Sequence, residues 1–129
     1  MEIISSKEAP AAIGPYSQAV AAGSFVFISG QLGLDASGKL VSEKTEEQAD
    51  AILRNMKAIL NEKGLSLSSV AKTTIFLANL ADFEKVNEVY ARHFGTHRPA
   101  RSTVQVAALP RGAKVEIEAI AVATNKTVE

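Results

Sequence analysis

The sequence contains no cysteine and only two histidines. Without cysteine the chain can form neither a disulfide nor a thiolate metal site, and a cysteine nucleophile is excluded. His93 and His97 are four residues apart, a spacing that a metal pair can have. However, Gly95 lies between them at an expected helix end, and no third histidine or cysteine completes a zinc ligand set. We therefore expect no bound metal.

An excess of charge of either sign is also missing, because Lys plus Arg and Asp plus Glu number 14 each. This balance gives no sequence-wide attraction to nucleic acid or to an anionic membrane. The sequence has no apolar run as long as a membrane span, and its first residues lack the features of a signal peptide. It has no glycine motif of the GxxxxGK or GxGxxG kind. We expect a cytoplasmic protein that binds neither membrane nor nucleic acid and uses no nucleotide.

The pattern of apolar, β-branched and turn residues predicts one domain over residues 1–129 with an α+β fold. Its expected order is strands, helix, strand, helix and two strands. The expected strands are Ile3-Ile4, 19–22, 24–31, 70–78, 98–106 and 115–122, the expected helices are 45–63 and 82–94, and Asn125–Glu129 is a polar tail.

Helix-start signals precede both expected helices. Thr45-Glu-Glu-Gln48 has the form of a capping box, and it is followed by apolar residues at helical spacing from Ala49 to Leu60. We expect Asp82 to cap the second helix. In that helix, Phe83, Val86 and Tyr90 are expected on the buried stripe.

Three expected strands are apolar on both faces, at Phe25–Ile28, Ile75–Ala78 and Ala119–Val122. Two helices can cover only one face of such a sheet, and an exposed apolar area of this extent usually marks an interface. The pattern therefore predicts a homo-oligomer. The alternative is that some of these strands are central and the others merely tolerate apolar residues.

Two charged residues near the C-terminal end are candidates for a site. Arg101 shares a strand face with Thr103, and a guanidinium on a rigid strand can bind a carboxylate or phosphate through paired hydrogen bonds. Glu116 begins a row that continues through Glu118 into apolar residues, which indicates partial burial, and it can position or deprotonate a water. The alternative for both is a structural ion pair between neighbouring strands.

Other candidates are weaker when taken alone. Tyr16 follows a turn that is fixed by prolines and a glycine, and its hydroxyl either faces a ligand or packs under a loop. Asn87 lies on the expected second helix, where an exposed asparagine usually has no role. Ser29 and Ser102 lack the histidine with an acidic partner that a catalytic triad requires.

Six segments carry a resemblance to a known family: 11–19 (AAIGPYSQA), 28–31 (ISGQ), 70–77 (VAKTTIFL), 82–87 (DFEKVN), 99–104 (PARSTV) and 115–121 (VEIEAIA). In this order and spacing, from about residue 9 to residue 123, they resemble the RidA/YjgF family of reactive-intermediate deaminases. The resemblance implies a chorismate-mutase-like mixed sheet with two helices on one face. It also implies a homotrimer whose three sheets form a central barrel, with ligand clefts between subunits.

The implied activity is hydrolysis of 2-imino acids, such as 2-iminobutanoate and 2-iminopropanoate, to 2-oxo acids and ammonia without a cofactor. By the same resemblance Arg101 binds the substrate carboxylate and Glu116 positions the water. The remaining cleft positions are matched by Tyr16, Ser29, Gly30 and Asn87.

This sequence departs from the family pattern at two places beside Arg101. Thr103 stands where some relatives have cysteine, and its hydroxyl can still donate a hydrogen bond to a substrate. The segment 94–99 is shorter than in some relatives, and it has Arg98 where a hydrophobic residue can stand. Substrate preference is therefore open.

Two other functions are alternatives to deamination. One is a trimer that binds small carboxylates as a regulatory or chaperone-like module. The other is an endoribonuclease or translation inhibitor, as members of the family have been described. The neutral charge and the two histidines argue against the second.

Overall fold

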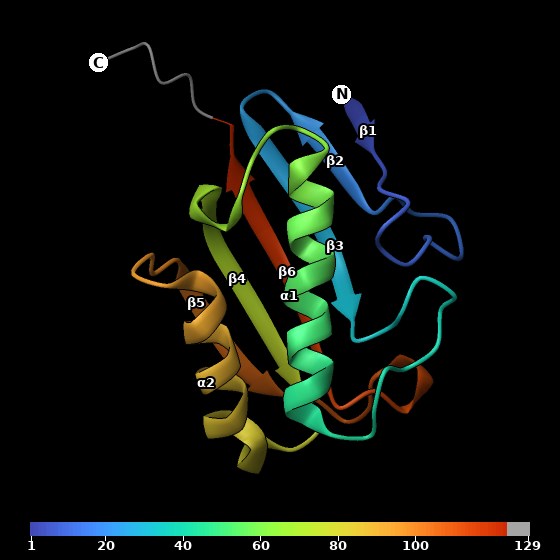
Figure 1. The fold of residues 1–129 in the computed structure, drawn as a ribbon, viewed down its shortest axis with the longest axis vertical. Coiled ribbons are helices and arrows are strands. Elements are labelled where there is room, and N and C mark those ends of the chain that lie inside the picture. The colour runs from blue at the N-terminus through green and yellow to red at the C-terminus, as the bar shows by residue number, and fades with distance from the viewer. Residues whose placement is uncertain (124–129) are drawn as a thin grey trace.

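The structure is a computed structural model that describes residues 1–123, so the tail expected at Asn125–Glu129 lies outside the described residues. One six-stranded sheet has the order β1-β2-β3-β6-β4-β5, and two helices cover one of its faces (Figure 1). The predicted α+β fold is confirmed. The elements are β1 Glu2–Ile4, β2 Ala19–Ala22, β3 Phe25–Leu32, α1 Thr45–Asn61, β4 Val70–Leu77, α2 Phe83–Phe94, β5 Ala100–Gln105 and β6 Val115–Val122, with short 3-10 turns at Leu67–Ser69, Leu80–Asp82 and Pro110–Gly112.

The last two strands, which the ion-pair alternative treated as neighbours, are not adjacent in the sheet. β4 lies between them, pairing in parallel with β5 and antiparallel with β6. The ion pair considered between Arg101 and Glu116 or Glu118 does not form. Register explains this, because Glu116 is opposite Phe76, which in turn is opposite Val104, so Glu116 shares a sheet face with Val104 and not with Arg101.

The core lies between the helices and the sheet. Ile52, Leu53 and Met56 of α1 are fully buried, and they belong to one cluster with Ile75 of β4 and Ile117 of β6. The apolar stripe predicted for the first helix is confirmed. Burial of this stripe is the main stabilising contribution of α1, at roughly 1.5–3 kcal/mol for each large side chain.

The capping box predicted at Thr45 is wrong. Lys44 occupies the N-cap position without a side-chain cap, and Thr45 is the first residue of α1. The Thr45 hydroxyl instead donates to a carboxylate oxygen of Asp82 at 2.8 Å, which ties the starts of the two helices together. Asp82 is at the N-cap position of α2 as predicted, but its side chain makes no cap hydrogen bond.

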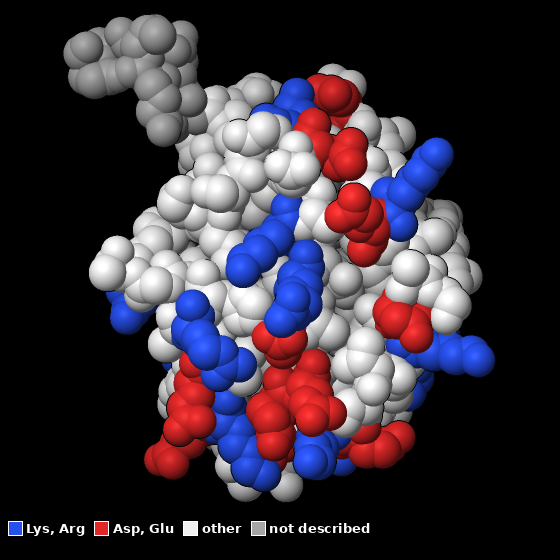
Figure 2. Space-filling model, in the orientation of Figure 1, with Lys and Arg blue, Asp and Glu red and all other residues white. Residues whose placement is uncertain are grey.

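The opposite sheet face is covered by neither helix, and it carries an exposed apolar area around β3. Phe25 and Phe27 are 47% and 43% exposed there, whereas Val26 and Ile28 of the same strand are buried under the helices. By contrast, charged side chains of both signs crowd the helix side (Figure 2). The bare face is the area that the sequence pattern assigned to an oligomer interface. Neither described helix is long and apolar enough to cross a membrane.

A buried glutamine fixes the long segment between β1 and β2. Gln18 is 4% exposed; its side-chain oxygen accepts from the Ser6 backbone N–H at 2.7 Å, and its amide donates to the carbonyl oxygens of Ser6 and Pro10. Substituting Gln18→Leu removes all three hydrogen bonds; within residues 1–123 the Ser6 N–H and the Pro10 carbonyl oxygen then have no partner, and the Ser6 carbonyl oxygen keeps only a 3.4 Å hydrogen bond from the Ala9 N–H. We expect a loss of about 2–4 kcal/mol in the free energy of unfolding, measured by urea denaturation.

The control for this prediction is Gln105→Leu. Gln105 also accepts a backbone hydrogen bond, from Leu80 at 2.7 Å, but it is exposed, so water can replace it. The Gln105→Leu substitution should lower the free energy of unfolding by less than about 1 kcal/mol. Equal losses in the two variants would contradict a special role for Gln18.

Candidate active site

The first group of site residues lies at the edge of the sheet beneath α2. Arg101, in β5, extends toward this helix: its guanidinium carbon is 5.0 Å from the centroid of the Tyr90 ring and 5.5 Å from that of Phe83. Both distances are within the range of a cation–π contact. Asn87 lines the same pocket as Arg101 and Tyr90. The two aromatic rings hold the guanidinium in place without accepting hydrogen bonds from it, so its N–H donors stay available to a ligand.

We call this pocket the arginine pocket; its volume is about 300 Å³, and it is lined by Asn87, Tyr90, Ala91, Arg98, Pro99 and Arg101. Tyr90 is anchored by a 2.7 Å hydrogen bond between its hydroxyl and that of the buried Thr73. Burial raises the pKa of Tyr90, against smaller opposing effects of the Thr73 hydrogen bond and of the charges of Arg101 and Arg98. The phenol therefore stays neutral at physiological pH.

Thr103 is two residues beyond Arg101 on the same face of β5. Its hydroxyl is buried, and among residues 1–123 it has no hydrogen-bond partner. Leaving a buried hydroxyl unpaired costs about 1–3 kcal/mol. A carboxylate bound to the Arg101 guanidinium could also accept a hydrogen bond from the unpaired Thr103 hydroxyl.

The second group surrounds Glu116 on the opposite face of the sheet. Between Ile28 and Gln31 the register of β3 against β6 shifts, so that Ser29 and Gly30 form a β-bulge. A Cβ atom at Gly30 would lie 1.8 Å from Oε2 of Glu116. The absence of a side chain at Gly30 thus gives the glutamate carboxylate its place directly over the backbone, and any larger residue would displace it.

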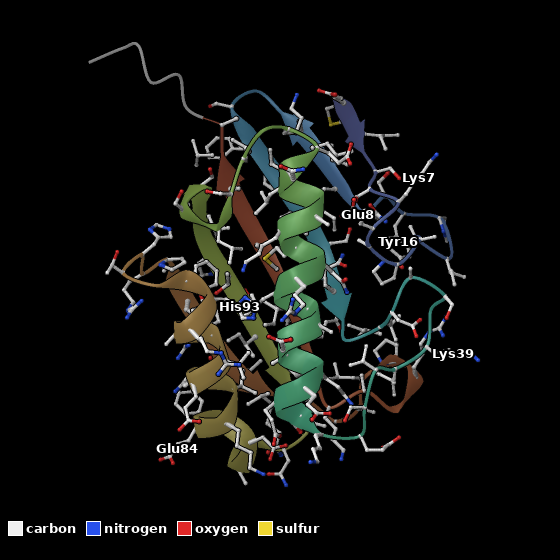
Figure 3. The ribbon with its side chains drawn as sticks, in the orientation of Figure 1. Lys7, Glu8, Tyr16, Lys39, Glu84 and His93 are labelled. Atoms are coloured by element: carbon white, nitrogen blue, oxygen red, sulfur yellow. The ribbon has the colours of Figure 1, made fainter. Side chains whose placement is uncertain are left out.

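The pocket around Glu116, which we call the glutamate pocket, has a volume of about 650 Å³ and includes Tyr16, Ser29, Gly30, Arg111 and Glu118 in its lining. The Ser29 hydroxyl donates to the Ser17 carbonyl oxygen at 2.6 Å. Tyr16 lies on the loop between β1 and β2, across the molecule from α2 (Figure 3), and it is 53% exposed.

The environment of Glu116 makes its carboxyl more basic. Burial raises its pKa, and the negative charge of Glu118 raises it further. A raised pKa brings a carboxylate closer to the working range of a general base, and a half-buried one can hold a water against a bound substrate.

The predicted site residues therefore form two groups that one chain does not bring together. Arg101, Thr103 and Asn87 lie on the helix side of the sheet. Tyr16, Ser29, Gly30 and Glu116 line a pocket on the other side, and the two pockets have no residue in common. The family resemblance placed all of these residues in clefts between subunits, but it did not indicate which of them one chain brings together.

The two histidines are engaged elsewhere. Nε2 of His93 lies 2.6 Å from a carboxylate oxygen of Asp50, between α2 and α1, and Nε2 of His97 lies 2.6 Å from the Val70 carbonyl oxygen. Within residues 1–123 no group of three potential metal-ligating side chains is present.

The sequence did not lead us to predict that the rings of Phe83 and Tyr90 contact the Arg101 guanidinium. Phe83 was predicted on the buried stripe, but it is 36% exposed, because it packs against the guanidinium at the edge of the sheet and not within the core. The signal that could have found it is spacing: Phe83, Asn87 and Tyr90 are at i, i+4 and i+7, on one face of α2. Arg111 was also missed; it adopts a left-handed conformation with φ 61° and donates to the Gly38 carbonyl oxygen at 2.7 Å, at the margin of the glutamate pocket.

Comparison with known proteins assigns the chain to a family. A family model described as Endoribonuclease L-PSP matches residues 6–123. The chain belongs to this family, RidA/YjgF. The resemblance drawn from six short sequence segments is thereby confirmed.

Among relatives in the RidA/YjgF family, the chain is 58% identical over 121 residues to "Reactive Intermediate Deaminase A, chloroplastic" of Arabidopsis thaliana, covering 93% of this chain and 65% of that longer protein. It is 50% identical over 121 residues to the Homo sapiens 2-iminobutanoate/2-iminopropanoate deaminase, covering 93% of this chain and 88% of the relative. The crystal structure of E. coli TdcF with bound serine superposes with a TM-score of 0.91 at 45% identity, covering 96% of this chain and 100% of that one.

Proposed function

We propose that this protein hydrolyses reactive 2-imino acids, such as 2-iminobutanoate and 2-iminopropanoate, to 2-oxo acids and ammonia. The observation that carries the proposal is the 50% identity, over nearly the whole chain, to a human relative named for this deaminase activity. The chain acts as one domain over residues 1–129. It needs no cofactor, and a cysteine-free sequence is compatible with work in the reducing cytoplasm.

The protein functions as a homotrimer in which the bare sheet faces pack around a central barrel. The exposed Phe25 and Phe27, with the half-buried Ile120 and Val122 of the adjacent strand, supply the apolar surface that this assembly needs. The catalytic site forms where the arginine pocket of one subunit meets the glutamate pocket of the next. The separation of the two groups on opposite sheet faces supports this arrangement, since neither group alone has both an anion-binding and a water-activating residue.

In this site Arg101 binds the substrate carboxylate through paired hydrogen bonds. Glu116 orients a water toward the imine carbon, which is electrophilic once the imine nitrogen is protonated. The water oxygen bonds to this carbon, the carbon–nitrogen bond breaks, and ammonia leaves as the 2-oxo acid forms. The reaction requires that the substrate and the water are oriented and that a proton is transferred, and Arg101 and Glu116 are sufficient for both.

The remaining residues shape the cleft. The unpaired Thr103 hydroxyl donates to the carboxylate that Arg101 binds, and the Asn87 amide lies beside it. From the neighbouring subunit, Tyr16 and the Ser29–Gly30 bulge enclose the imine side of the substrate next to Glu116. The absence of a side chain at Gly30 lets the Glu116 carboxylate and the substrate approach the backbone.

The experiment that tests this function generates 2-iminobutanoate in the cuvette with a threonine dehydratase and traps free imine with semicarbazide. We expect the protein to divert imine to 2-oxobutanoate before it is trapped, whereas the Arg101→Ala and Glu116→Ala variants should not. Absence of diversion by the wild-type protein would remove the deaminase function. Tight binding of 2-oxobutanoate without turnover would then favour a regulatory module, and salt-dependent RNA binding would favour a ribonuclease.

The activity should depend on pH through Glu116, whose carboxyl must be ionised to accept a proton. Because burial and Glu118 raise the pKa of Glu116, kcat/KM should fall as pH falls through that raised value. The Glu118→Gln variant removes one of the two causes. Its acid limb should move to lower pH in a kcat/KM profile, and an acid limb that does not move would contradict the assignment of Glu116 as the titrating group.

A further inference from the structure

Two arginines line the arginine pocket. Besides Arg101, Arg98 faces this space from the segment between α2 and β5. No acidic side chain is among the residues that line it. Within one subunit, two positive charges in a pocket of about 300 Å³ have no counter-charge among the lining residues, and an anionic ligand would reduce the repulsion between them.

Arg98 is held in position by the backbone. Its NH1 nitrogen donates to the carbonyl oxygen of Gly95 and, at 3.1 Å, to that of His97, at the C-terminal end of α2. NH1 has two N–H donors, so both are used, while the donors on Nε and NH2 make no hydrogen bond within residues 1–123. The Arg98 side chain is thus held in place through NH1, while its Nε and NH2 donors are free to bind an anion.

Both guanidinium groups belong to residues that line the arginine pocket together with Tyr90. Because this one pocket has a volume of about 300 Å³, one small molecule inside it can contact both arginines. The carboxylate carbons of a four- or five-carbon diacid are roughly 4–5 Å apart in the extended form.

A monocarboxylic imino acid gives the pocket only one negative charge. When its carboxylate binds Arg101, Arg98 keeps its positive charge and its free donors. A second carboxylate on the substrate side chain would match that charge and accept those donors.

We propose that the protein accepts dicarboxylic 2-imino acids, such as 2-iminosuccinate and 2-iminoglutarate, and that Arg98 binds their second carboxylate. Arg98 is then the residue that determines specificity between dicarboxylic and monocarboxylic imines. The reaction is the same hydrolysis: water adds to the imine carbon, the carbon–nitrogen bond breaks, and the products are a dicarboxylic 2-oxo acid and ammonia. This inference rests on the proposed function.

The test measures kcat/KM for 2-iminoglutarate and for 2-iminobutanoate in the same protein preparation. Each imine is generated from its amino acid by an amino-acid oxidase, with semicarbazide as the competing trap. For Arg98→Leu we expect the ratio of the dicarboxylic to the monocarboxylic value to fall about ten- to hundredfold, which is the effect of losing a charge-assisted hydrogen bond pair. Arg98→Lys should restore part of the ratio.

The matched control is Arg92→Leu, which removes an exposed arginine of α2 that does not line the arginine pocket. It should leave the ratio unchanged. A purely structural role of Arg98 at the end of α2 would lower both kcat/KM values together and would not move their ratio, so an unchanged ratio in Arg98→Leu would overturn the proposal.

Binding separates failure of this inference from failure of the proposed function. If the wild-type protein hydrolyses neither imine, calorimetry with succinate and butanoate still decides the role of Arg98. The proposal requires succinate to bind the wild-type protein at least about tenfold more tightly than butanoate, and it requires Arg98→Leu to abolish that difference. Equal affinity for the two acids would refute it even in an active enzyme.

Discussion

Replacing Arg101 with alanine is expected to lower kcat/KM for 2-iminobutanoate by about a hundred- to a thousandfold, through loss of the bidentate contact to the substrate carboxylate. The fold should be little affected, because Arg101 lies on an edge strand and makes no ion pair within residues 1–123. Its packing against Tyr90 and Phe83 contributes about 1 kcal/mol to stability. Steady-state kinetics and a thermal unfolding curve measure the two effects.

Two variants control this result. Arg92→Ala removes an exposed arginine elsewhere on the helix side, and it should keep full activity. Arg101→Lys keeps the charge but loses the planar fork, so its activity should be intermediate. An Arg101→Ala protein that retains its activity would exclude this residue from the mechanism.

The second large effect is expected from Gly30→Ala, one of the smallest possible substitutions. The new Cβ atom would lie 1.8 Å from Oε2, 2.8 Å from Cδ and 3.1 Å from Cγ of Glu116, so the carboxylate must move. A displacement of about 1 Å of a catalytic group can cost on the order of a hundredfold in rate. Because the obstructing atoms are the end of a flexible side chain, we expect a stability loss of only about 1 kcal/mol.

A double-mutant cycle isolates this contact. In a Glu116→Ala background the obstruction is gone, so Gly30→Ala should have almost no further effect on the unfolding free energy or on the residual rate. Gly33→Ala is the contrasting case: its Cβ atom would lie 2.6 Å from the Cα atom of Gln48, where backbone must move, and stability should fall more than for Gly30→Ala. Full activity of Gly30→Ala would show that the position of the Glu116 carboxylate is not critical.

Most of the fold was predictable from local patterns. Alternation assigned Phe25 and Phe27 to one face of β3 and Val26 and Ile28 to the other, and their exposures agree. The apolar residues at helical spacing from Ala49 to Leu60 were likewise predicted to be buried, and they are. These predictions work because, within one helix or strand, the residues on the buried face are apolar and recur with the period of that element.

Strand order and helix capping could not be predicted in the same way. The pairing of β4 with both β5 and β6 depends on contacts between residues far apart in sequence, for which alternation has no signal. Thr45 failed as a cap because Asp82, 37 residues further along, bonds its hydroxyl. Tertiary contacts of this kind override local propensity.

The identity of the site residues stays a prediction from the sequence, and what the structure adds is their distribution over two pockets. Arg101 and Glu116 stood out as a rigidly placed guanidinium and a carboxylate in an apolar row. Their location on opposite sheet faces followed only once β4 was found between their strands. The bare face was predicted from the strands that are apolar on both faces, and it connects the two observations, because an assembly that covers it can also join the two pockets.

The measurement that tests this account most directly mixes two inactive proteins. If the protein is the proposed trimer, Arg101→Ala and Glu116→Ala subunits that are unfolded together in equal amounts and refolded should form mixed trimers, in which some interfaces pair an intact Arg101 with an intact Glu116 of the neighbour. For random mixing in a cyclic trimer, about a quarter of the wild-type imine hydrolysis should return. If the mixed sample stays as inactive as either parent, while refolded wild-type protein recovers its activity, the site does not form between subunits and the account is wrong.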